Sequence, residues 1–274
     1  MCELRRRFLR ESKVNVMRIP VCLFMMLVFC SSGIAQPVRP TISKLPADLV
    51  KETSFLNPEF LVYSQHSNNE KSVPLVIYLH GAGGVGEEIS RIKGQPMGVL
   101  RGIEKFKKGP CIIVAPQCLR TSQNGKRGTW NKKDLNVLLR HLKTILPIDE
   151  TRIYLTGNSM GGYGAWMWGG ANPEHFAAIA PIVGGIGPRG PKDITEDLVA
   201  WAKNLAKVPV YAFVGGEDKV VPADRSKIMV KEIEKAGGKL MKLKVYPDEG
   251  HNASRSVFKE REYFDWMFDQ QKQP

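Results

Sequence analysis

Residues 157–161, Gly-Asn-Ser-Met-Gly, form a G-x-S-x-G motif that constrains the fold more than any other feature of the chain. The motif follows a β-prone run at residues 152–156 and precedes residues 162–167, which can continue as a helix. Between a strand and a helix, this pattern predicts a sharp turn that lifts the Ser159 hydroxyl above a sheet edge, and the glycines remove side chains that would clash there. Glycine and serine are common, so the interpretation depends on the surrounding segments.

Strands and helices alternate along the rest of the chain. Apolar, β-prone runs predict strands at residues 60–64, 75–79, 111–115, 152–156, 177–183, 208–214 and 240–246, the first of them antiparallel. The spacing of apolar residues predicts helices at residues 134–146, 221–236 and 254–268. This alternation favours a single-domain α/β fold with a mostly parallel sheet and helices on both faces. Residues 184–207 have room for one short helix, so no large cap is expected and the site should be an open cleft.

Three side chains suited to nucleophilic catalysis occur in the order Ser159, Asp218 and His251. Each lies just past the carboxyl end of a predicted strand, where open α/β sheets place their sites. Serine becomes a good nucleophile only when a base removes its proton, so His251 is expected to be that base. Asp218 is expected to hold His251 in the useful tautomer and to stabilise the imidazolium. Three neighbouring carboxylates are alternatives to Asp218, namely Glu217, Asp224 and Asp248.

Two backbone N–H groups are expected to form the oxyanion hole. One belongs to Met160, at the start of the predicted helix, and the other to Ala82, in the glycine-rich loop at residues 80–84. His80 begins this loop and is a candidate substrate-binding residue, although a structural hydrogen bond that shapes the loop is the preferred interpretation.

Aromatic side chains near the motif offer a wall for a phenolic or sugar group. The candidates are Trp130 and Tyr163, together with Trp166. Packing in the core is the competing interpretation for all three, because large aromatic side chains are usually well buried.

The motifs together resemble those of the α/β-hydrolases. The chain resembles the secreted esterase and "predicted peptidase" group, which includes feruloyl-esterase-like and polyhydroxybutyrate-depolymerase-like enzymes. The matching segments are residues 80–84, residues 115–118 with Trp130, residues 157–165, residues 216–222 and residues 250–251. They extend over roughly residues 60 to 265. The resemblance implies the fold and a serine–acid–histidine triad, and it says little about the substrate.

The expected function is that of an exported serine hydrolase that cleaves carboxylic esters through an acyl-enzyme and needs no cofactor. A small-molecule ester or an ester linked to polysaccharide, such as a feruloylated or acetylated one, is the expected substrate. A serine peptidase of the prolyl-oligopeptidase-like group is one alternative, and a catalytically silent carbohydrate-binding scaffold is another. No metal is expected, since the sequence has no cysteine–histidine cluster and no H-E-x-x-H motif.

The N-terminal residues have the pattern of a signal peptide. Basic residues precede an apolar run at residues 19–30, and small and polar residues follow it. The run is shorter than the roughly 20 residues of a membrane-spanning helix, so we expect cleavage after Ala35, no stable membrane insertion afterwards, and a secreted or periplasmic protein. The expected organisation is a signal peptide at 1–35, a lead-in at 36–57 and an α/β-hydrolase domain at 58–274. Met1 and Met17 are alternative starting residues.

The chain is strongly basic, with a formal net charge of +13. The first 35 residues carry six basic and two acidic side chains, which leaves about +9 on the remainder. Lysines crowd residues 219–244, without interleaved aromatic residues or a known nucleic-acid motif, so no nucleic-acid partner is expected. A solvated basic face is one interpretation, and attraction to an acidic polysaccharide or an anionic surface is the other. The sequence leaves the oligomeric state unknown.

Cys111 and Cys118 are the cysteines that remain after cleavage. They lie at the two ends of one predicted strand, roughly 23 Å apart if it is extended. A disulfide needs Cα atoms within about 7 Å. We therefore expect two free, buried thiols.

Overall fold

The computed structural model describes residues 39–64, 72–106, 108–121, 125, 127–188 and 190–272. The predicted signal peptide at residues 1–35 lies outside the described residues. Within the described part of the chain, none of the helices is both long enough and apolar enough to cross a membrane.

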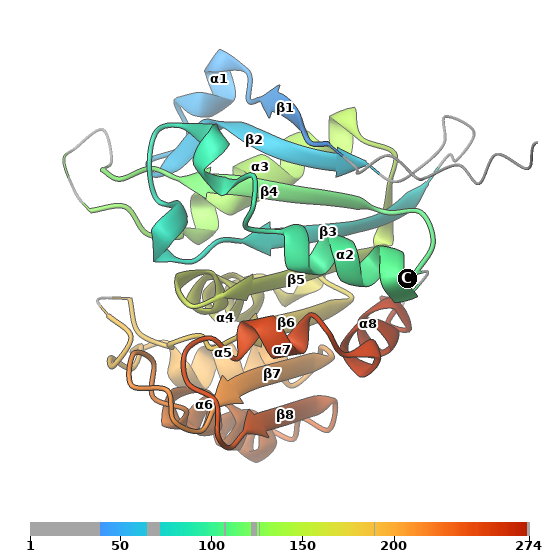
Figure 1. Cartoon of the computed structure of the whole chain (residues 1–274). Coiled ribbons are helices and arrows are strands. Elements are labelled where there is room, and N and C mark those ends of the chain that lie inside the picture. The colour runs from blue at the N-terminus through green and yellow to red at the C-terminus, as the bar shows by residue number, and fades with distance from the viewer. Residues whose placement is uncertain are drawn as a thin grey trace, which may run out of the picture. The chain divides into compact units, whose positions relative to one another are not determined.

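An eight-stranded sheet forms the centre of the molecule, with strand order β1-β2-β4-β3-β5-β6-β7-β8 (Figure 1). The strands are β1 (Thr41–Lys44), β2 (Leu56–Ser64), β3 (Val73–Leu79), β4 (Ile112–Cys118), β5 (Ile148–Asn158), β6 (Ala178–Ile182), β7 (Val210–Gly215) and β8 (Met241–Tyr246). β2 is antiparallel to both β1 and β4, whereas the other neighbours pair in parallel. The predicted, mostly parallel sheet with an early antiparallel strand is confirmed.

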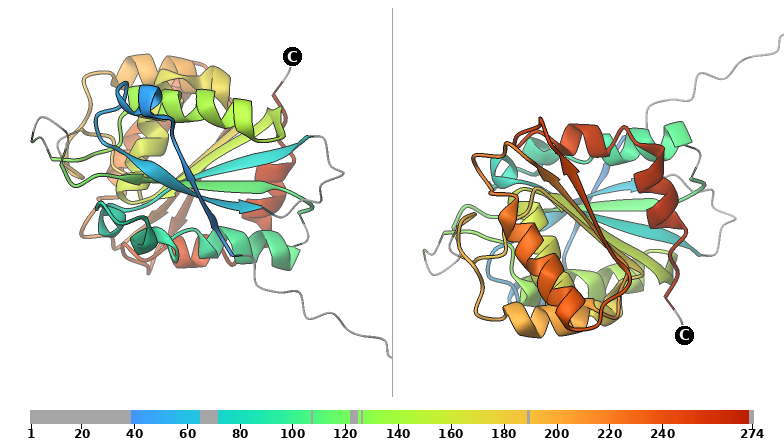
Figure 2. Two further views of the ribbon diagram at one scale, coloured as in Figure 1. Left: turned by 90° about the horizontal axis from the view of Figure 1, so that it is seen from above. Right: turned by 90° about the horizontal axis from the view of Figure 1, so that it is seen from below.

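Helices cover both faces of this sheet, as predicted (Figure 2). One face carries α1 (Ala47–Val50), α3 (Lys132–Ile145), α4 (Met160–Ala171), α5 (Leu198–Leu205) and α6 (Asp224–Lys235). The other face carries α2 (Met97–Phe106), α7 (Ser254–Val257) and α8 (Arg261–Phe268). Three short 3₁₀ helices are η1 (Ala82–Gly84), η2 (Ile89–Ile92) and η3 (Pro173–His175). The connection from β6 to β7 contains α5 as its one described helix, in agreement with the prediction that no large cap is present.

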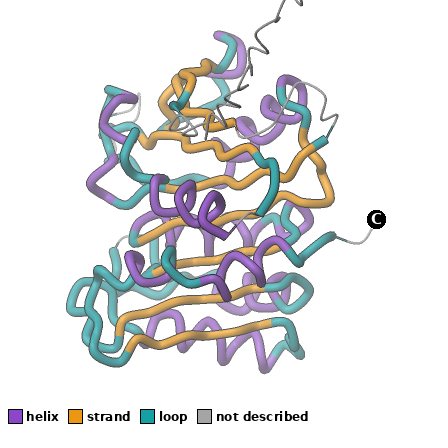
Figure 3. Tube along the Cα trace, turned by 45° about the vertical axis from the view of Figure 1, so that its right-hand side comes forward, coloured by secondary structure: helices purple, strands orange, loops and turns teal. Residues whose placement is uncertain are grey.

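Helices flank the strands of the sheet (Figure 3). Buried side chains form two hydrophobic cores, one on each face of the sheet. Every residue of β3, β4, β6 and β7 is buried. Parallel strands that are covered on both faces have no side that faces solvent, so nearly all of their side chains are apolar. This explains the continuous apolar runs in the sequence. The carboxyl ends of the parallel strands meet at one sheet edge, so the loops that follow β3, β5, β7 and β8 lie close together.

The segment at residues 36–57 is more than the lead-in that the sequence suggested. It contains α1 and the edge strand β1, which pairs with β2 in a register that places Thr41 opposite Val62. The side chain of Leu45, just after β1, is buried in the core. The sheet therefore begins before residue 58.

Helix α2 was not predicted, because glycines at positions 98 and 102 lower the helical propensity of the segment. The structure shows why they are there. A Cβ atom at Gly98 would lie 2.6 Å from the Phe258 ring, and one at Gly102 would lie 1.9 Å from the Phe264 ring. The two glycines thus let α2 approach the C-terminal segment closely.

The single helix predicted at residues 254–268 is wrong, since the structure divides it into α7 and α8. Glu260 separates the two with an extended backbone, φ −92° and ψ 126°. Its carboxylate accepts a hydrogen bond from Lys244 on β8 at 2.7 Å. Because this contact is made with a strand outside the segment, the break between α7 and α8 cannot be seen in the local spacing of apolar residues.

His141 on α3 is only 8% exposed, and its ring packs edge-on against Phe60 at 6.3 Å. Cys111 and Cys118 are both buried and form no disulfide, as predicted. Burial raises the pKa of both thiols to about 12, which keeps them protonated.

Candidate active site

The turn between β5 and α4 places Ser159 at the carboxyl edge of the sheet. Its backbone has φ 58° and ψ −118°, a conformation that side-chain-bearing residues rarely adopt. Such strain persists where the surrounding structure fixes it, and it is typical of a nucleophile turn. Ser159 precedes α4 without capping it through its side chain, so its hydroxyl is available for another partner.

The glycines of the motif are required by close backbone packing. A Cβ atom at Gly157 would lie 2.6 Å from the carbonyl oxygen of Gly161. One at Gly161 would lie 1.9 Å from the carbonyl oxygen of Leu79, at the end of β3. The serine turn therefore sits directly against the loop that follows β3.

Three side chains that are distant in sequence converge at this edge. Nε2 of His251 lies 2.8 Å from Oγ of Ser159, and Nδ1 of His251 lies 2.8 Å from Oδ2 of Asp218. His251 follows β8 and Asp218 follows β7, as the sequence indicated. When Nδ1–H donates to the carboxylate, the lone pair of Nε2 faces the serine hydroxyl, which is the arrangement that a general base needs.

Asp218 is held in place by the backbone of its own loop. Its second carboxylate oxygen accepts hydrogen bonds from the N–H groups of Val220 at 2.8 Å and Val221 at 2.9 Å. The side chain is only 1% exposed, whereas that of His251 is 28% exposed. The three neighbouring carboxylates considered as alternatives, Glu217, Asp224 and Asp248, are all exposed.

The two expected oxyanion donors lie beside the serine. Ala82 and Met160 line the same cleft as Ser159. Because Met160 is the first residue of α4, no carbonyl of that helix can accept its N–H, and the positive end of the helix dipole lies there. Ala82 opens η1, which is closed by a hydrogen bond from the Gly84 N–H to the Gly81 carbonyl at 3.0 Å.

His80 lies behind the oxyanion loop, with only 1% of its surface exposed. Nδ1 contacts the Gly81 carbonyl at 2.7 Å, and Nε2 accepts the N–H of Cys118 at 3.0 Å, so the Nδ1–H tautomer satisfies both contacts. Burial lowers the pKa of His80 to about 4, which keeps the ring neutral. Both nitrogens are used inside the protein, so the ring shapes the loop and does not reach the cleft.

Trp130 is likewise placed in the interior. Its ring lies 4.8 Å from that of His80, and its Nε1–H donates to the His80 carbonyl at 3.1 Å. Trp166 is fully buried on α4. Of the aromatic residues expected to form a substrate wall, only Tyr163 lines the cleft. Burial raises the pKa of Tyr163 to about 12, so its hydroxyl stays protonated and can donate a hydrogen bond.

The cleft beside Ser159 has a volume of about 430 Å³. Most of its wall is apolar or glycine and proline backbone, and Arg127 and Thr129 add polar groups. The lining residues that the sequence reasoning missed are Arg127, Thr129, Pro188, Pro191, Val220 and Val221. They lie in loops without periodicity. The one sequence signal for any of these residues was the apolar pair Val220 and Val221, shortly after Asp218.

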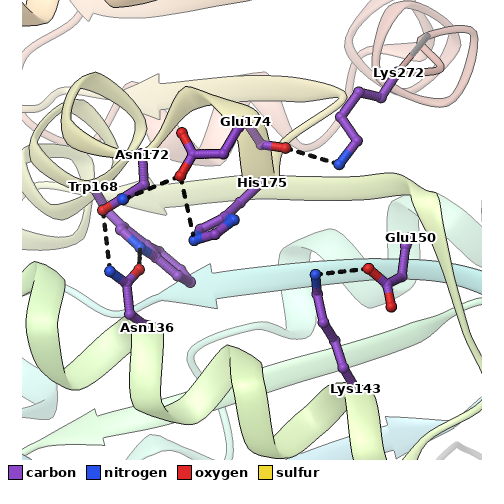
Figure 4. A network of polar contacts seen from close by, with 8 residues as sticks. All are labelled: Asn136, Lys143, Glu150, Trp168, Asn172, Glu174, His175 and Lys272. Carbon is purple, nitrogen blue, oxygen red and sulfur yellow. Dashed lines mark hydrogen bonds and ion pairs between the residues drawn. The ribbon is translucent and has the colours of Figure 1, made fainter. Parts of the chain in front are cut away.

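His175 belongs to a different region, because it lies just before β6, at the edge formed by the amino ends of the parallel strands. Figure 4 shows the polar network around it. His175 ends η3, and its Nε2 lies 3.8 Å from Glu174. Nearby, Asn136 accepts a hydrogen bond from the Trp168 Nε1–H at 2.6 Å. This network ties α3 and α4 together and contains no group within reach of Ser159.

Among the described residues, no group of three or more histidine, cysteine, aspartate or glutamate side chains is arranged to hold a metal ion.

Comparison with known proteins agrees with this geometry. A model of the dienelactone hydrolase family matches residues 117–261, a range that contains Ser159, Asp218 and His251. A Salmonella typhimurium protein assigned as a carboxymethylenebutenolidase is 33% identical over 109 residues, 38% of this chain and 37% of that protein. A protein of Aspergillus oryzae assigned as feruloyl esterase C is 26% identical over 125 residues, 43% of each chain. The matches thus span less than half the length of these curated relatives.

Solved structures show the same fold. A thermostable esterase has a TM-score of 0.64 at 27% identity, over 82% of this chain and 64% of that one. A ferulic acid esterase has a TM-score of 0.60 at 17% identity, over 84% of this chain and 96% of that one. The resemblance to α/β-hydrolases is therefore confirmed. By the family match over more than half of its length, the chain belongs to the dienelactone hydrolase family of the α/β-hydrolase superfamily.

Proposed function

We propose that this protein is a serine hydrolase that cleaves carboxylic esters through an acyl-enzyme. The observation that carries the proposal is the position of His251, whose two ring nitrogens each lie 2.8 Å from an oxygen, one of Ser159 and one of Asp218. Membership of an ester-hydrolase family supports the same reaction class.

In the first half of the reaction, the Ser159 oxygen attacks the ester carbonyl carbon while Nε2 of His251 takes the serine proton. The carbonyl oxygen becomes an oxyanion that accepts hydrogen bonds from the N–H groups of Ala82 and Met160. The buried Asp218 carboxylate stabilises the imidazolium. The tetrahedral intermediate then expels the alcohol, which receives the proton from Nε2, and the acyl group stays on Ser159.

In the second half, water replaces the alcohol. His251 removes a proton from the water as its oxygen attacks the acyl carbon, and the same two N–H groups hold the oxyanion. Collapse of this intermediate breaks the bond to Ser159 Oγ, which regains a proton from His251. The products are the free acid and the starting enzyme.

The shape of the cleft supports esters with a flat or short acyl group. Glycine and proline backbone, with Val220 and Val221, gives an apolar surface against which a planar group can lie. The Tyr163 hydroxyl and Arg127 supply hydrogen-bond donors at the wall. We propose phenolic or acetyl esters carried on polysaccharide as the substrates, a choice also supported by the feruloyl esterase names among the relatives.

We also propose that the protein is exported. The basic and apolar N-terminal pattern carries this part of the proposal. A polymeric ester outside the cell is the kind of substrate that an exported hydrolase with an uncapped cleft can reach.

A substrate panel tests the proposed function. Purified protein should hydrolyse p-nitrophenyl acetate and methyl ferulate, should release acetate from acetylated xylan, and should leave a proline-containing peptide intact. Ser159→Ala should lower kcat by about 10⁶-fold, as in other triad enzymes. Peptide cleavage without ester cleavage would contradict the proposed reaction class, and an active Ser159→Ala variant would place the nucleophile elsewhere.

A further inference from the structure

A second cavity, of about 730 Å³, lies on the other side of the serine turn. It is bounded by α2, by the segment from α7 to Lys259, and by Tyr78 and Asn158 at the ends of β3 and β5. Asn158 lines this cavity, whereas the next residue, Ser159, lines the substrate cleft. We call the second cavity the basic groove, after its cationic lining residues Arg91, Arg101, Lys105, Arg255 and Lys259.

The charge of the basic groove has one sign. No aspartate or glutamate is among the described residues that line it, and the five cationic side chains named above are exposed. Within the described part of the chain, the ion pairs include none with Arg101, Arg255 or Lys259. A concave surface lined by charges of one sign concentrates counter-ions and attracts ligands of the opposite charge.

The lysine-rich segment at residues 219–244 differs from the basic groove in this respect. Of the seven lysines in this segment, Lys227, Lys235 and Lys244 each have a carboxylate partner, at 3.4, 2.5 and 2.7 Å. Their charge is partly neutralised on the protein itself. The basic groove, and not this segment, is therefore the stronger candidate for binding an anion.

The basic groove has cations on two walls. One wall is α2, whose Gly98 and Gly102 pack against the rings of Phe258 and Phe264. Arg101 and Lys105 are four residues apart and so extend from one side of the same helix. Lys259 approaches from the opposite wall, between α7 and α8. A chain lying in the basic groove would have cations on both sides.

The lining chemistry favours an acidic polysaccharide over other polyanions. Single-stranded nucleic acid is held by stacking its bases on aromatic faces. Here the Tyr78 hydroxyl is hydrogen-bonded to Asn158 at 2.6 Å, and the Phe258 ring packs edge-on against Tyr263 at 5.7 Å. Membrane binding adds exposed apolar residues to basic ones. None of the large exposed apolar side chains among the described residues lines this cavity.

We propose that the basic groove binds an acidic polysaccharide through its carboxylate or sulfate groups and thereby holds the polymer next to Ser159. The presentation of an ester to the serine rests on the proposed function, whereas binding of the polymer does not. Uronate-rich and sulfated glycans share the required chemistry, so the test contains both.

The test variant is Arg101→Gln with Lys259→Gln, which removes one cation from each wall. Arg91 is left unchanged because its Nε–H donates to the Gly83 carbonyl in the oxyanion loop at 3.0 Å. Arg255 is left unchanged because it lies only four residues after His251. The matched control is Lys231→Gln with Lys239→Gln, two exposed lysines outside the basic groove that give the same change in net charge.

Binding is measured in the Ser159→Ala background, so that no ester is turned over. Polygalacturonate, dextran sulfate and neutral dextran are titrated at low and high salt. The Arg101→Gln, Lys259→Gln variant should bind at least one of the two acidic glycans about tenfold more weakly, as expected for the loss of two exposed ion pairs. The affinity of the Lys231→Gln, Lys239→Gln control for the same glycan should change about twofold or less. With Ser159 intact, both variants should hydrolyse p-nitrophenyl acetate at the normal rate.

The outcomes separate the two proposals. Equal weakening by both variants, no binding of either acidic glycan, or tighter groove-dependent binding of single-stranded DNA or of phosphatidylserine vesicles would overturn the proposed polysaccharide site. Loss of ester hydrolysis in the unmutated protein, with glycan binding intact, would overturn the proposed function and leave the basic groove standing. Greater weakening for polygalacturonate than for dextran sulfate would identify a carboxylate ligand, and the reverse a sulfate ligand.

Discussion

Nε2 of His251 lies 2.8 Å from Oγ of Ser159, although 92 positions separate the two residues in the sequence. The contact exists because β5 and β8 run in the same direction and end at the same edge of the sheet. The loop after each strand then needs to extend only a few residues to bring the hydroxyl and the imidazole together.

Asp218 should matter for catalysis far more than its exposed neighbours. Asp218→Asn keeps the volume of the side chain and removes the charge that orients His251 and stabilises its protonated form, so kcat should fall by about 10⁴-fold. The melting temperature, measured alongside kcat, shows whether the variant is folded. Asp248→Asn, at an exposed position in the loop before His251, is the control and should retain activity. Equal effects of the two changes would assign the acid role to another carboxylate.

The glycine at position 161 should be important for stability. In Gly161→Ala, the new methyl group would lie 1.9 Å from the Leu79 carbonyl oxygen, which is backbone and cannot move away cheaply. We expect the free energy of unfolding in urea to fall by about 3 kcal/mol. Gly83→Ala, where a Cβ atom meets nothing within 4 Å, is the matched control and should leave stability nearly unchanged. A stable Gly161→Ala protein would show that the turn is less tightly packed than described.

His80 should make stability depend on pH. Its pKa is lowered from 6.5 to about 4 by burial, so between these values the unfolded chain binds a proton that the folded protein does not. The contribution of the neutral ring is therefore complete above about pH 6.5 and is lost as the pH falls toward 4, by roughly 2 kcal/mol between pH 7 and pH 4.5.

Replacing His80 isolates this effect. The free energy of unfolding is measured for the wild type and for His80→Gln at pH 7 and pH 4.5. His80→Gln should be the less stable protein at pH 7, and the difference between the two should shrink at pH 4.5. A difference that stays constant with pH would mean that His80 is not neutral in the folded protein.

The N-terminal prediction is tested by the mature protein. If residues 1–35 are a signal peptide, protein recovered from the periplasm or medium should begin at Gln36, as determined by mass spectrometry of its N-terminal peptide. Recovery of peptides from residues 18–35 in the mature protein would contradict cleavage. A precursor peptide from residues 1–16 would decide between Met1 and Met17 as the start.

Much of this architecture could be predicted from local patterns. The strands that build the carboxyl edge are continuous apolar runs, and the motif at residues 157–161 marks the turn, because these features depend on the chain immediately around them. Helix α2 could not be predicted in this way. Its glycines reduce helical propensity, and the rings that require them, Phe258 and Phe264, lie more than 150 residues away in the sequence.

The surroundings of the candidate site were harder to predict for the same reason. Trp130 was a candidate for a substrate wall, yet the fold turns it into the interior, where its Nε1–H donates to the His80 carbonyl. His80 has the structural role in the oxyanion loop that was the preferred interpretation of the sequence. The sequence alone also pointed to a different region as the most positively charged part of the chain. Lysines are densest at residues 219–244, whereas the basic groove collects its cations from α2 and from the segment between α7 and α8, which only tertiary packing brings together.

The central claim is that Ser159 is made nucleophilic by His251. Its most direct test is to label the purified protein with a fluorophosphonate and to locate the adduct by peptide mass spectrometry, with His251→Ala as the comparison. The account predicts one phosphonylated residue, Ser159, and labelling that nearly disappears in His251→Ala although the variant remains folded. Labelling at another serine, or equally fast labelling without the imidazole, would contradict it.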